Sequence, residues 1–323
     1  MLAIVRDVYG PPEVLRIEEQ PAPEVPADHV LVDVRATSVT TAEWRMRAAD
    51  FPPGFRLLGR LFTGLFRPRV RTTGREFAGT VRAVGSAVTD LRPGDEVFGV
   101  HEGGANAEQI AVPASGVIVR MPAGLSHAEA VAMPFGSLTA IDFLEDRAQV
   151  QPGERVLVVG ASGGVGVYAV QVAKQAGAEV VGVCSTANLE LVRSLGADAV
   201  VDYTKADPRD AGETYDVVVD TAGKTSVSGY RDALRPGGRH VFIEGGFGSL
   251  LHALVSRWRR GPRVIGGVTL DTRAAFERLR ARVEAGRLRP VVGHRFAMAD
   301  VVDAHRLVER RHRRGAVVLD FPV

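Results

Sequence analysis

A glycine-rich turn between an apolar run and a helical pattern carries the clearest chemistry in this sequence. Residues 155–159 (RVLVV) are apolar after the arginine and predict a strand that is buried on both faces. Residues 167–178 keep apolar positions at helical spacing. The turn between them therefore lies at the start of a helix, where backbone amides bind phosphate.

The residue types in this turn fit a pyrophosphate. Gly163 lets the backbone come close to phosphate groups, and Gly166 permits tight packing of the helix on the strand. Ala161 stands where the common fingerprint has its first glycine. A purely structural turn is the alternative, but the strand before the turn and the helix after it favour a dinucleotide site.

The end of the next apolar run, residues 179–184, bears on which dinucleotide binds. An acidic residue there would hold the ribose hydroxyls of NAD, and the sequence has none at this point. Ser185, Thr186 and Asn188 follow instead, and their hydroxyl and amide groups are able to donate hydrogen bonds to a 2′-phosphate. We therefore predict NADP(H). Tyr203, after the third strand, either lies near the adenosine or is a half-buried tyrosine at a strand end.

The elements that must position this turn alternate between strand and helix. We expect strands at residues 155–160, 180–184, 199–202, 216–220, 240–244 and 264–268, which predict a doubly wound parallel α/β sheet. The region before about residue 125 has short alternating segments between Pro and Gly turns, which is typical of a mainly antiparallel β domain. Helices at 273–284 and 299–310 and a strand at 316–320 return to that domain. The expected domains are therefore 1–124 with 272–323, and 125–271.

Composition limits the function classes. With 323 residues and 46% hydrophobic content, the chain is able to bury a large core in two domains. Its 40 Lys and Arg against 38 Asp and Glu predict no general attraction to nucleic acid or to an acidic membrane. A basic cluster at residues 257–263 is read as a solvated loop, with single-stranded nucleic acid as the alternative partner.

Cysteine usage and hydropathy indicate the compartment. The single cysteine, Cys184, excludes an internal disulfide framework and a structural zinc knuckle, and it fits a reducing cytoplasm. No apolar run reaches the roughly 18 residues of a membrane span, and no secretory leader pattern begins the chain. We expect a cytoplasmic protein with no membrane partner.

Several motifs in a fixed order carry a family resemblance. The chain resembles the medium-chain dehydrogenase/reductase superfamily, in its zinc-independent quinone oxidoreductase-like branch. The resemblance implies a GroES-like β domain and a Rossmann domain, with substrate and nicotinamide meeting between them. The segments that carry it are residues 30–39 (VLVDVRATSV), 74–85 (GREFAGTVRAVG), 94–99 (GDEVFG), 104–108 (GANAE), 130–140 (AVAMPFGSLTA), 153–166, 195–203 (LGADAVVDY) and 314–319 (RGAVVL).

The same resemblance implies cofactor contacts along the second domain. Thr221, which follows the fourth strand, lies at the carboxyl edge of the sheet, where it is either a ligand contact or a turn former. By motif position the pyrophosphate contacts are Ser162, Gly163, Gly164, Val165 and Gly166, those of the adenosine end are Ser185, Thr186, Asn188 and Tyr203, and those on the nicotinamide side are Thr139, Ile243, Glu244, Gly245 and Gly246.

The zinc ligands of the wider superfamily are missing. Thr40 or Thr41 lies near the position of the expected cysteine, and Arg75 replaces the histidine of a Gly-His-Glu motif. Zinc requires thiolate or imidazole ligands, so we predict no metal site. Without a Lewis acid, the favoured substrates are quinones or carbon-carbon double bonds conjugated to a carbonyl, reduced by hydride from NADPH.

The usual Ser-Val-Asn motif reads Ser38-Val39-Thr40, and no clear proton donor follows it. Thr40 and Arg45 are the candidates for orienting a carbonyl oxygen, although each is also explained as a polar residue at a domain interface. The missing donor leaves a second hypothesis, an NADPH-binding redox sensor or scaffold without catalytic turnover. An acceptor panel that leaves bound NADPH unoxidised would favour it.

Two further expectations concern surfaces. Residues 51–70 carry large apolar side chains among arginines and predict either an apolar lid over the substrate or a surface helix packed on a partner subunit. Relatives are commonly homodimers that pair edge strands, and the apolar run at 264–270 would serve as that edge. The alternative for this run is an ordinary buried strand.

Overall fold

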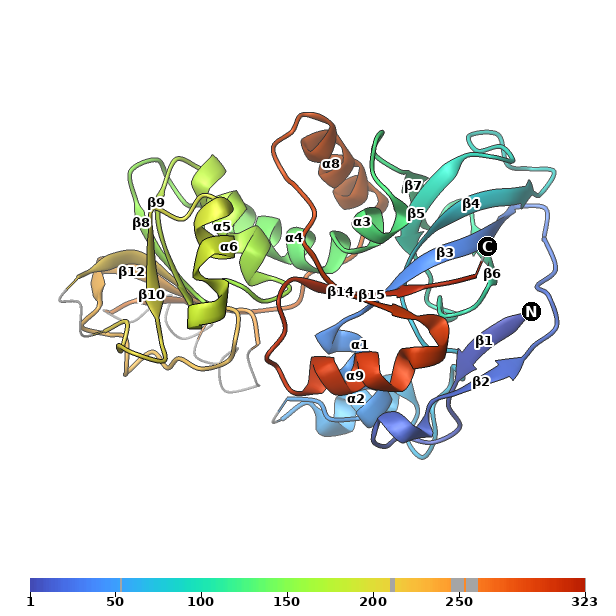
Figure 1. Cartoon of the computed structure of the whole chain (residues 1–323), viewed down its shortest axis with the longest axis horizontal. Coiled ribbons are helices and arrows are strands. Elements are labelled where there is room, and N and C mark those ends of the chain that lie inside the picture. Colours follow the sequence, from blue (N-terminus) through green and yellow to red (C-terminus); the bar gives the residue numbers. More distant parts are fainter. Residues whose placement is uncertain (53, 210–212, 245–252, 254–260, 323) are drawn as a thin grey trace. The chain divides into compact units, whose positions relative to one another are not determined.

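The computed structural model describes the whole chain except residues 53, 210–212, 245–252, 254–260 and 323. The described residues divide into two compact units. The first comprises Met1–Phe51, Arg56–Phe135 and Asp271–Val323, and the second comprises Pro52–Phe55 and Gly136–Leu270. Each unit contains its own large sheet (Figure 1).

The second unit is built on six parallel strands in the order β10-β9-β8-β11-β12-β13. This order reverses between β8 and β11, as in a doubly wound Rossmann sheet, and it confirms the predicted fold class. The strands are β8 (Arg155–Val159), β9 (Glu179–Cys184), β10 (Ala199–Asp202), β11 (Tyr215–Asp220), β12 (Leu234–Phe242) and β13 (Arg263–Ile265).

Helices cover this parallel sheet, which explains its apolar strands. Val156, Leu157 and Val158 of β8 are fully buried, because parallel strands have both faces covered. The helical elements are α4 (Pro134–Ile141) with its π-helical continuation η2 (Asp142–Arg147), α5 (Gly166–Gln175), the 3₁₀ turn η3 (Thr186–Asn188) and α6 (Leu189–Ser194).

The last two strands differ from the expected bounds. β12 begins at Leu234 rather than at residue 240, because Leu234 pairs with Tyr215 before a register shift in β11. β13 ends at Ile265 rather than at residue 268. The Arg147 guanidinium donates hydrogen bonds to the carbonyls of Gly266 and Val268, so these residues leave the strand ladder.

The first unit holds a seven-stranded sheet in the order β14-β15-β3-β4-β5-β7, with β6 paired to β3. All of its pairs are antiparallel except β14 with β15, which confirms the mainly antiparallel domain. A separate antiparallel pair joins β1 to β2. The strands are β1 (Leu2–Val5), β2 (Arg16–Glu19), β3 (His29–Val39), β4 (Glu76–Val84), β5 (Glu96–Val100), β6 (Gln109–Pro113), β7 (Val117–Arg120), β14 (Val292–Ala297) and β15 (Ala316–Asp320).

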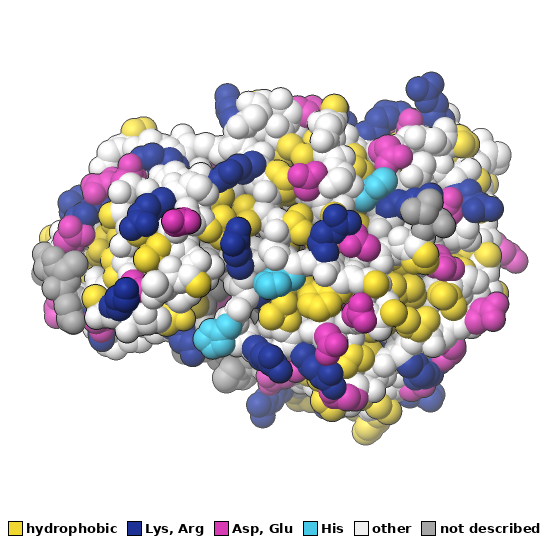
Figure 2. Space-filling view, viewed as in Figure 1, with side chains coloured by type: hydrophobic (Ala, Val, Ile, Leu, Met, Phe, Trp, Pro, Cys, Tyr) yellow, Lys and Arg dark blue, Asp and Glu magenta, His cyan; other side chains and the backbone are white. Residues whose placement is uncertain are grey.

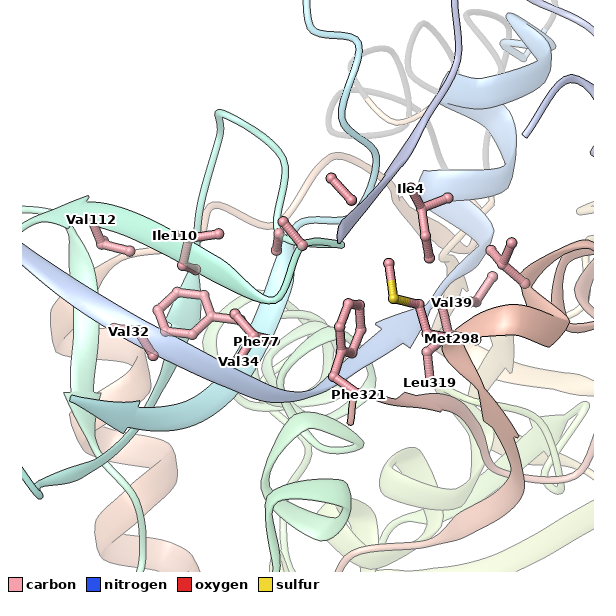
Figure 3. Close-up of a cluster of buried hydrophobic side chains, with 14 of the residues drawn as sticks. Ile4, Val32, Val34, Val39, Phe77, Ile110, Val112, Met298, Leu319 and Phe321 are labelled. Atoms are coloured by element: carbon pink, nitrogen blue, oxygen red, sulfur yellow. The ribbon is translucent and has the colours of Figure 1, made fainter. Parts of the chain in front are cut away.

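The core of this unit draws on both ends of the chain. Figure 3 shows Ile4 from the start of the chain with Phe77 from β4 and Phe321 from the end of the chain among the buried side chains. The helical elements are η1 (Pro12–Val14), α1 (Thr41–Ala48), α2 (Arg56–Thr63), α3 (His127–Val131), α8 (Arg273–Glu284), η4 (Met298–Asp300) and α9 (Val301–Glu309).

Candidate functional site

The predicted phosphate turn joins the end of β8 to the start of α5. Gly163 donates its N–H to the carbonyl of Gly160 at 3.0 Å, which closes the turn. Among the described residues, no acceptor takes the backbone N–H of Ser162, Gly164 or Val165. Unpaired amides at the start of a ten-residue helix form an anion site, because the helix dipole adds to their partial positive charge.

The glycines of the turn have different reasons for being glycine. A Cβ on Gly166 would lie 2.1 Å from the carbonyl oxygen of Gly160, so the close approach of α5 to β8 requires a glycine. A Cβ on Gly163 would meet only that same oxygen, at 3.3 Å. Packing therefore accounts for Gly166, whereas Gly163 leaves its side of the turn open to a ligand.

Two other segments of the second unit lie against this turn. The Thr221 hydroxyl, after β11, lies 2.9 Å from the carbonyl oxygen of Val159 and 3.1 Å from that of Gly160. Gly136 of α4 lies so close that its Cβ would approach the Gly164 carbonyl oxygen to 2.1 Å. This contact brings α4, and with it the buried Thr139, to the phosphate turn. Gly136 was not singled out from the sequence, because only the packed structure reveals this approach.

The predicted adenosine contacts gather at the carboxyl end of β9. The Asn188 side-chain amide donates to the Ser185 hydroxyl at 3.2 Å. Tyr203 donates its backbone N–H to the carbonyl of Cys184, which places Tyr203 beside the end of β9. Tyr203 is 51% exposed, which leaves part of it open to a ligand and also fits a half-buried tyrosine at a strand end.

Asp202, an acidic residue outside the sequence-predicted site, also lies at this end of the sheet. The parallel register places Asp202, the last residue of β10, opposite Cys184. The hydroxyls of Thr186 and Thr204 donate hydrogen bonds to its carboxylate, and these bonds lower the pKa of Asp202 to about 2. In the sequence, Asp202 is visible only as the last residue of the third predicted strand. The strand register is needed to show that it lies beside the end of β9.

The remaining cofactor candidates lie past β12. Ile243 donates its backbone N–H to the Asp220 carbonyl at 3.1 Å, and Glu244 follows it, half-buried. Gly245 and Gly246 lie outside the described residues. The described candidates of the second unit thus follow the carboxyl ends of successive parallel strands, or pack on the turn there, which is the ligand-binding edge of such a sheet.

Thr40, in the first unit, is the N-cap of α1. Its Oγ1 accepts the backbone N–H of Glu43 at 3.2 Å, and the side chain is only 6% exposed. Among the described residues, no acceptor takes the hydroxyl proton of Thr40. The cap fixes the oxygen while leaving the proton free to donate, as a group that orients a carbonyl oxygen must.

Arg45 is the other candidate, and its surroundings differ. It lies on α1 with its guanidinium over the ring of Trp44, 5.3 Å from the ring centroid. Arg311 lies over the same ring at 5.5 Å. A guanidinium on an aromatic face is oriented by packing, so Arg45 has a structural role that does not depend on a substrate.

A buried carboxyl and an ion-paired arginine lie at the start of β4. Ser38 donates its hydroxyl proton to Glu76 at 3.0 Å. Burial raises the pKa of Glu76 to about 7, although the neighbouring Arg75 opposes this shift. Arg75 itself pairs with Glu102 at 2.6 Å and with Asp271 at 3.2 Å. Arg75, which the resemblance places where the superfamily's zinc-binding histidine stands, is thus a cation bound to two carboxylates.

The described part of the chain contains no group of three or more His, Cys, Asp or Glu side chains arranged to hold a metal ion. Nor does it contain a helix long and apolar enough to cross a membrane. The basic cluster predicted at residues 257–263 lies largely outside the described residues.

One unit with a parallel dinucleotide-type sheet and another with a GroES-like β sheet, in the same chain, define the class of a nicotinamide-dependent oxidoreductase, and the comparisons specify the family. Residues 26–141 match the model "Alcohol dehydrogenase GroES-like domain", and residues 195–319 match the model "Zinc-binding dehydrogenase". The chain belongs to the medium-chain dehydrogenase/reductase superfamily, in its quinone oxidoreductase-like branch, and is an oxidoreductase of the quinone or alkenal/one class.

Three of the most similar proteins illustrate this. The 2-methylene-furan-3-one reductase of Solanum lycopersicum is 33% identical over 96% of this chain and 76% of its own length. The chloroplastic NADPH-dependent alkenal/one oxidoreductase of Arabidopsis thaliana is 31% identical over 100% of this chain and 80% of its own. The quinone oxidoreductase of Coxiella burnetii superposes with a TM-score of 0.85 at 28% identity, covering 99% of both chains.

Proposed function

We propose that this protein is a zinc-independent reductase that uses NADPH to reduce a quinone or a carbon-carbon double bond conjugated to a carbonyl. The observation that carries the proposal is Arg75, whose guanidinium stands at the metal-ligand position in ion pairs with Glu102 and Asp271. Because this position offers a cation instead of a ligand, the acceptor must take hydride without activation by zinc.

The second unit fits the dinucleotide. The amides of Ser162, Gly164 and Val165 would hold the pyrophosphate, and Ser185, Asn188 and Tyr203 would contact the adenosine end. When bound, NADPH supplies the hydride. The chain's own residues bind and orient the cofactor at the edge of the parallel sheet.

The carbonyl oxygen of the acceptor has a candidate hydrogen-bond donor in the first unit. Thr40 keeps its hydroxyl proton free while its oxygen is fixed by the Glu43 amide. We assign it the role of a hydrogen-bond donor to the carbonyl oxygen on which negative charge develops, with the final proton taken from water. Arg45 is the second candidate for that role.

NADPH preference follows from the absence of an acid after β9 and from the NADPH-dependent relative of Arabidopsis thaliana. The negative charge of Asp202 opposes NADPH binding, because the carboxylate lies beside Thr186 and already accepts the hydrogen bond of its hydroxyl. Arg193 of α6 is exposed on the helix that follows β9, and its positive charge favours NADPH. We therefore expect a preference for NADPH that is modest, because the two charges offset each other.

The proposal includes a homodimer in the cytoplasm. β13 is the outermost strand that the structure describes in the parallel sheet, where it pairs with β12, and we propose this side of the sheet for contact with a second copy. Val264 and Ile265 are buried against their own unit, so backbone pairing would form this interface. The single buried cysteine fits a reducing compartment.

The test is the rate of NADPH oxidation with a simple quinone and then with a conjugated enone, with a metal chelator present and NADH in parallel. Turnover that survives the chelator supports the proposal. Activity that the chelator abolishes would refute zinc independence. Tight NADPH binding with no turnover on any acceptor would favour the redox-sensor or scaffold hypothesis instead.

A further inference from the structure

Helix α2 has an unusual relation to the unit that carries it. None of its eight residues is buried, although the helix contains three leucines and a phenylalanine. Phe62 is 77% exposed, and Phe66 just beyond the helix is 88% exposed. We call the exposed side chains in and after this helix the α2 apolar surface: Leu57, Leu58, Leu61, Phe62, Leu65 and Phe66.

The helix attaches to its unit by its polar face. Tyr9 places its hydroxyl 3.0 Å from the Thr63 hydroxyl and 2.7 Å from the Gly64 carbonyl oxygen. The Arg60 guanidinium lies over the Tyr9 ring, 4.7 Å from its centroid. A Cβ on Gly59 would lie 2.4 Å from the Phe51 ring, so the Gly59 side is also packed.

The usual arrangement of a surface helix is therefore inverted. At 3.6 residues per turn, Gly59, Arg60 and Thr63 share one face of α2, and the four apolar residues occupy the opposite face. In a globular protein the apolar stripe of a helix normally faces the core. Here it faces outward while the polar face contacts Tyr9 and Phe51. Folding of this unit does not account for the apolar face, which indicates a partner.

The charge around the helix identifies the chemistry of that partner. Figure 2 shows basic and acidic side chains interspersed over the face that it displays. Residues 51–75, in contrast, contain six arginines and no acidic residue. Arg56 lies 3.8 Å from the carboxylate of Asp50, just before the segment, and Arg71 and Arg75 are also held in ion pairs. Arg67 and Arg69 are exposed and make no ion pair among the described residues.

We propose that the α2 apolar surface, together with Arg67 and Arg69, docks this protein on an anionic lipid surface. A short helix with an apolar face and flanking arginines lies in the plane of the membrane interface, with its apolar side chains among the acyl chains and its guanidinium groups at the lipid phosphates. Such docking needs no spanning helix. It revises the expectation of no membrane partner, because the balanced charge of the whole chain conceals the arginines gathered in residues 51–75.

A second copy of the chain fits this surface less well. A two-fold interface would place the same patch on both subunits, so Arg67 and Arg69 would meet their own copies with no acid in the segment to pair with them. The arginines could bind the phosphates of a single-stranded nucleic acid. The leucines that make up most of the surface, however, have no ring face on which bases could stack.

The experiment is flotation of the full chain with lipid vesicles. The probes are vesicles of phosphatidylcholine alone and of phosphatidylcholine with about one third phosphatidylglycerol. We expect binding to the anionic vesicles only, and weaker binding as salt rises. The double variants Phe62→Ser/Phe66→Ser and Arg67→Gln/Arg69→Gln should each lower the partition coefficient between water and the anionic vesicles by about tenfold or more.

The matched control is Leu2→Ser/Ile17→Ser, which removes two exposed apolar side chains from β1 and β2 of the same unit, and this variant should bind as the wild type does. Circular dichroism of every variant verifies the fold. Wild-type protein that stays off anionic vesicles would overturn the proposal. So would vesicle binding that the α2 variants retain, or α2 variants that instead change the oligomeric mass in light scattering or abolish binding to an oligonucleotide.

Discussion

The carboxylate of Asp202 accepts a hydrogen bond from the hydroxyl of Thr186, which joins the carboxyl ends of β10 and β9. A nicotinamide dinucleotide on this sheet would have its adenosine ribose nearby. Thr186 therefore directs its one hydroxyl proton at a carboxylate, and a 2′-phosphate brought here would meet both an engaged donor and a negative charge.

We predict that Asp202→Asn increases the preference for NADPH. Removing one negative charge from the neighbourhood of a 2′-phosphate should change the ratio of NADPH to NADH dissociation constants roughly fivefold in favour of NADPH. Fluorescence titration with both cofactors measures this ratio. Asp207→Asn is the control, because Asp207 pairs with Arg209 instead. An unchanged ratio would show that the phosphate does not lie near Asp202.

Gly163→Ala and Gly166→Ala should separate cofactor binding from folding. The Cβ at position 166 would clash with the backbone of Gly160, so Gly166→Ala should lower the free energy of unfolding by about 1–3 kcal/mol. The Cβ at position 163 meets only the Gly160 oxygen, at 3.3 Å, so Gly163→Ala should lose less stability than Gly166→Ala but at least about tenfold in NADPH affinity. Chemical denaturation and titration check the two effects. Normal cofactor affinity in Gly163→Ala would contradict the proposed pyrophosphate position.

Thr40→Val should lower kcat through loss of the hydroxyl donor, by about 10²-fold if the donor stabilises the developing oxyanion. It should also cost about 1 kcal/mol of stability through loss of the α1 cap. Thr272→Val removes the same kind of cap from α8, where Thr272 accepts the Ala275 amide at 3.2 Å, and should leave kcat unchanged. Steady-state kinetics measures kcat for both variants. Equal kcat values in Thr40→Val and Thr272→Val would show that Thr40 serves only as a helix cap. Thr40→Ser should retain activity.

Glu76 should make stability depend on pH. Its pKa rises from 4.5 to about 7 on folding because burial favours the neutral acid. A raised pKa contributes stability that is fully present below pH 4.5 and is lost as the pH rises through about 7, which amounts to about 3 kcal/mol. Urea denaturation across this range should show the loss in the wild type but not in Glu76→Gln. Glu277→Gln, on the exposed side of α8, should behave as the wild type, and a shared pH profile for all three would exclude Glu76 as the cause.

The sequence determined the local features of this protein by itself. Strand, glycine turn and helix follow one another within residues 155–178, and their apolar spacing and small residues suffice to predict a doubly wound sheet with a phosphate turn. The bounds of helix α8 and strand β15, both near the C-terminus, follow from equally local patterns. These signals are readable because each is contained in one continuous stretch of chain.

The tertiary structure alone decided the relations between distant segments. Strand register places Asp202 beside Thr186, and close packing brings Gly136 to the phosphate turn. Folding also pairs Arg75 with Asp271, which lies almost 200 residues further along the chain. The sequence of residues 51–70 leaves open an apolar lid or a surface helix packed on a partner subunit, and only the contacts of Tyr9 reveal that α2 attaches to its own unit by its polar face. Periodicity predicts which residues share a face, but the packing partners decide which way that face points.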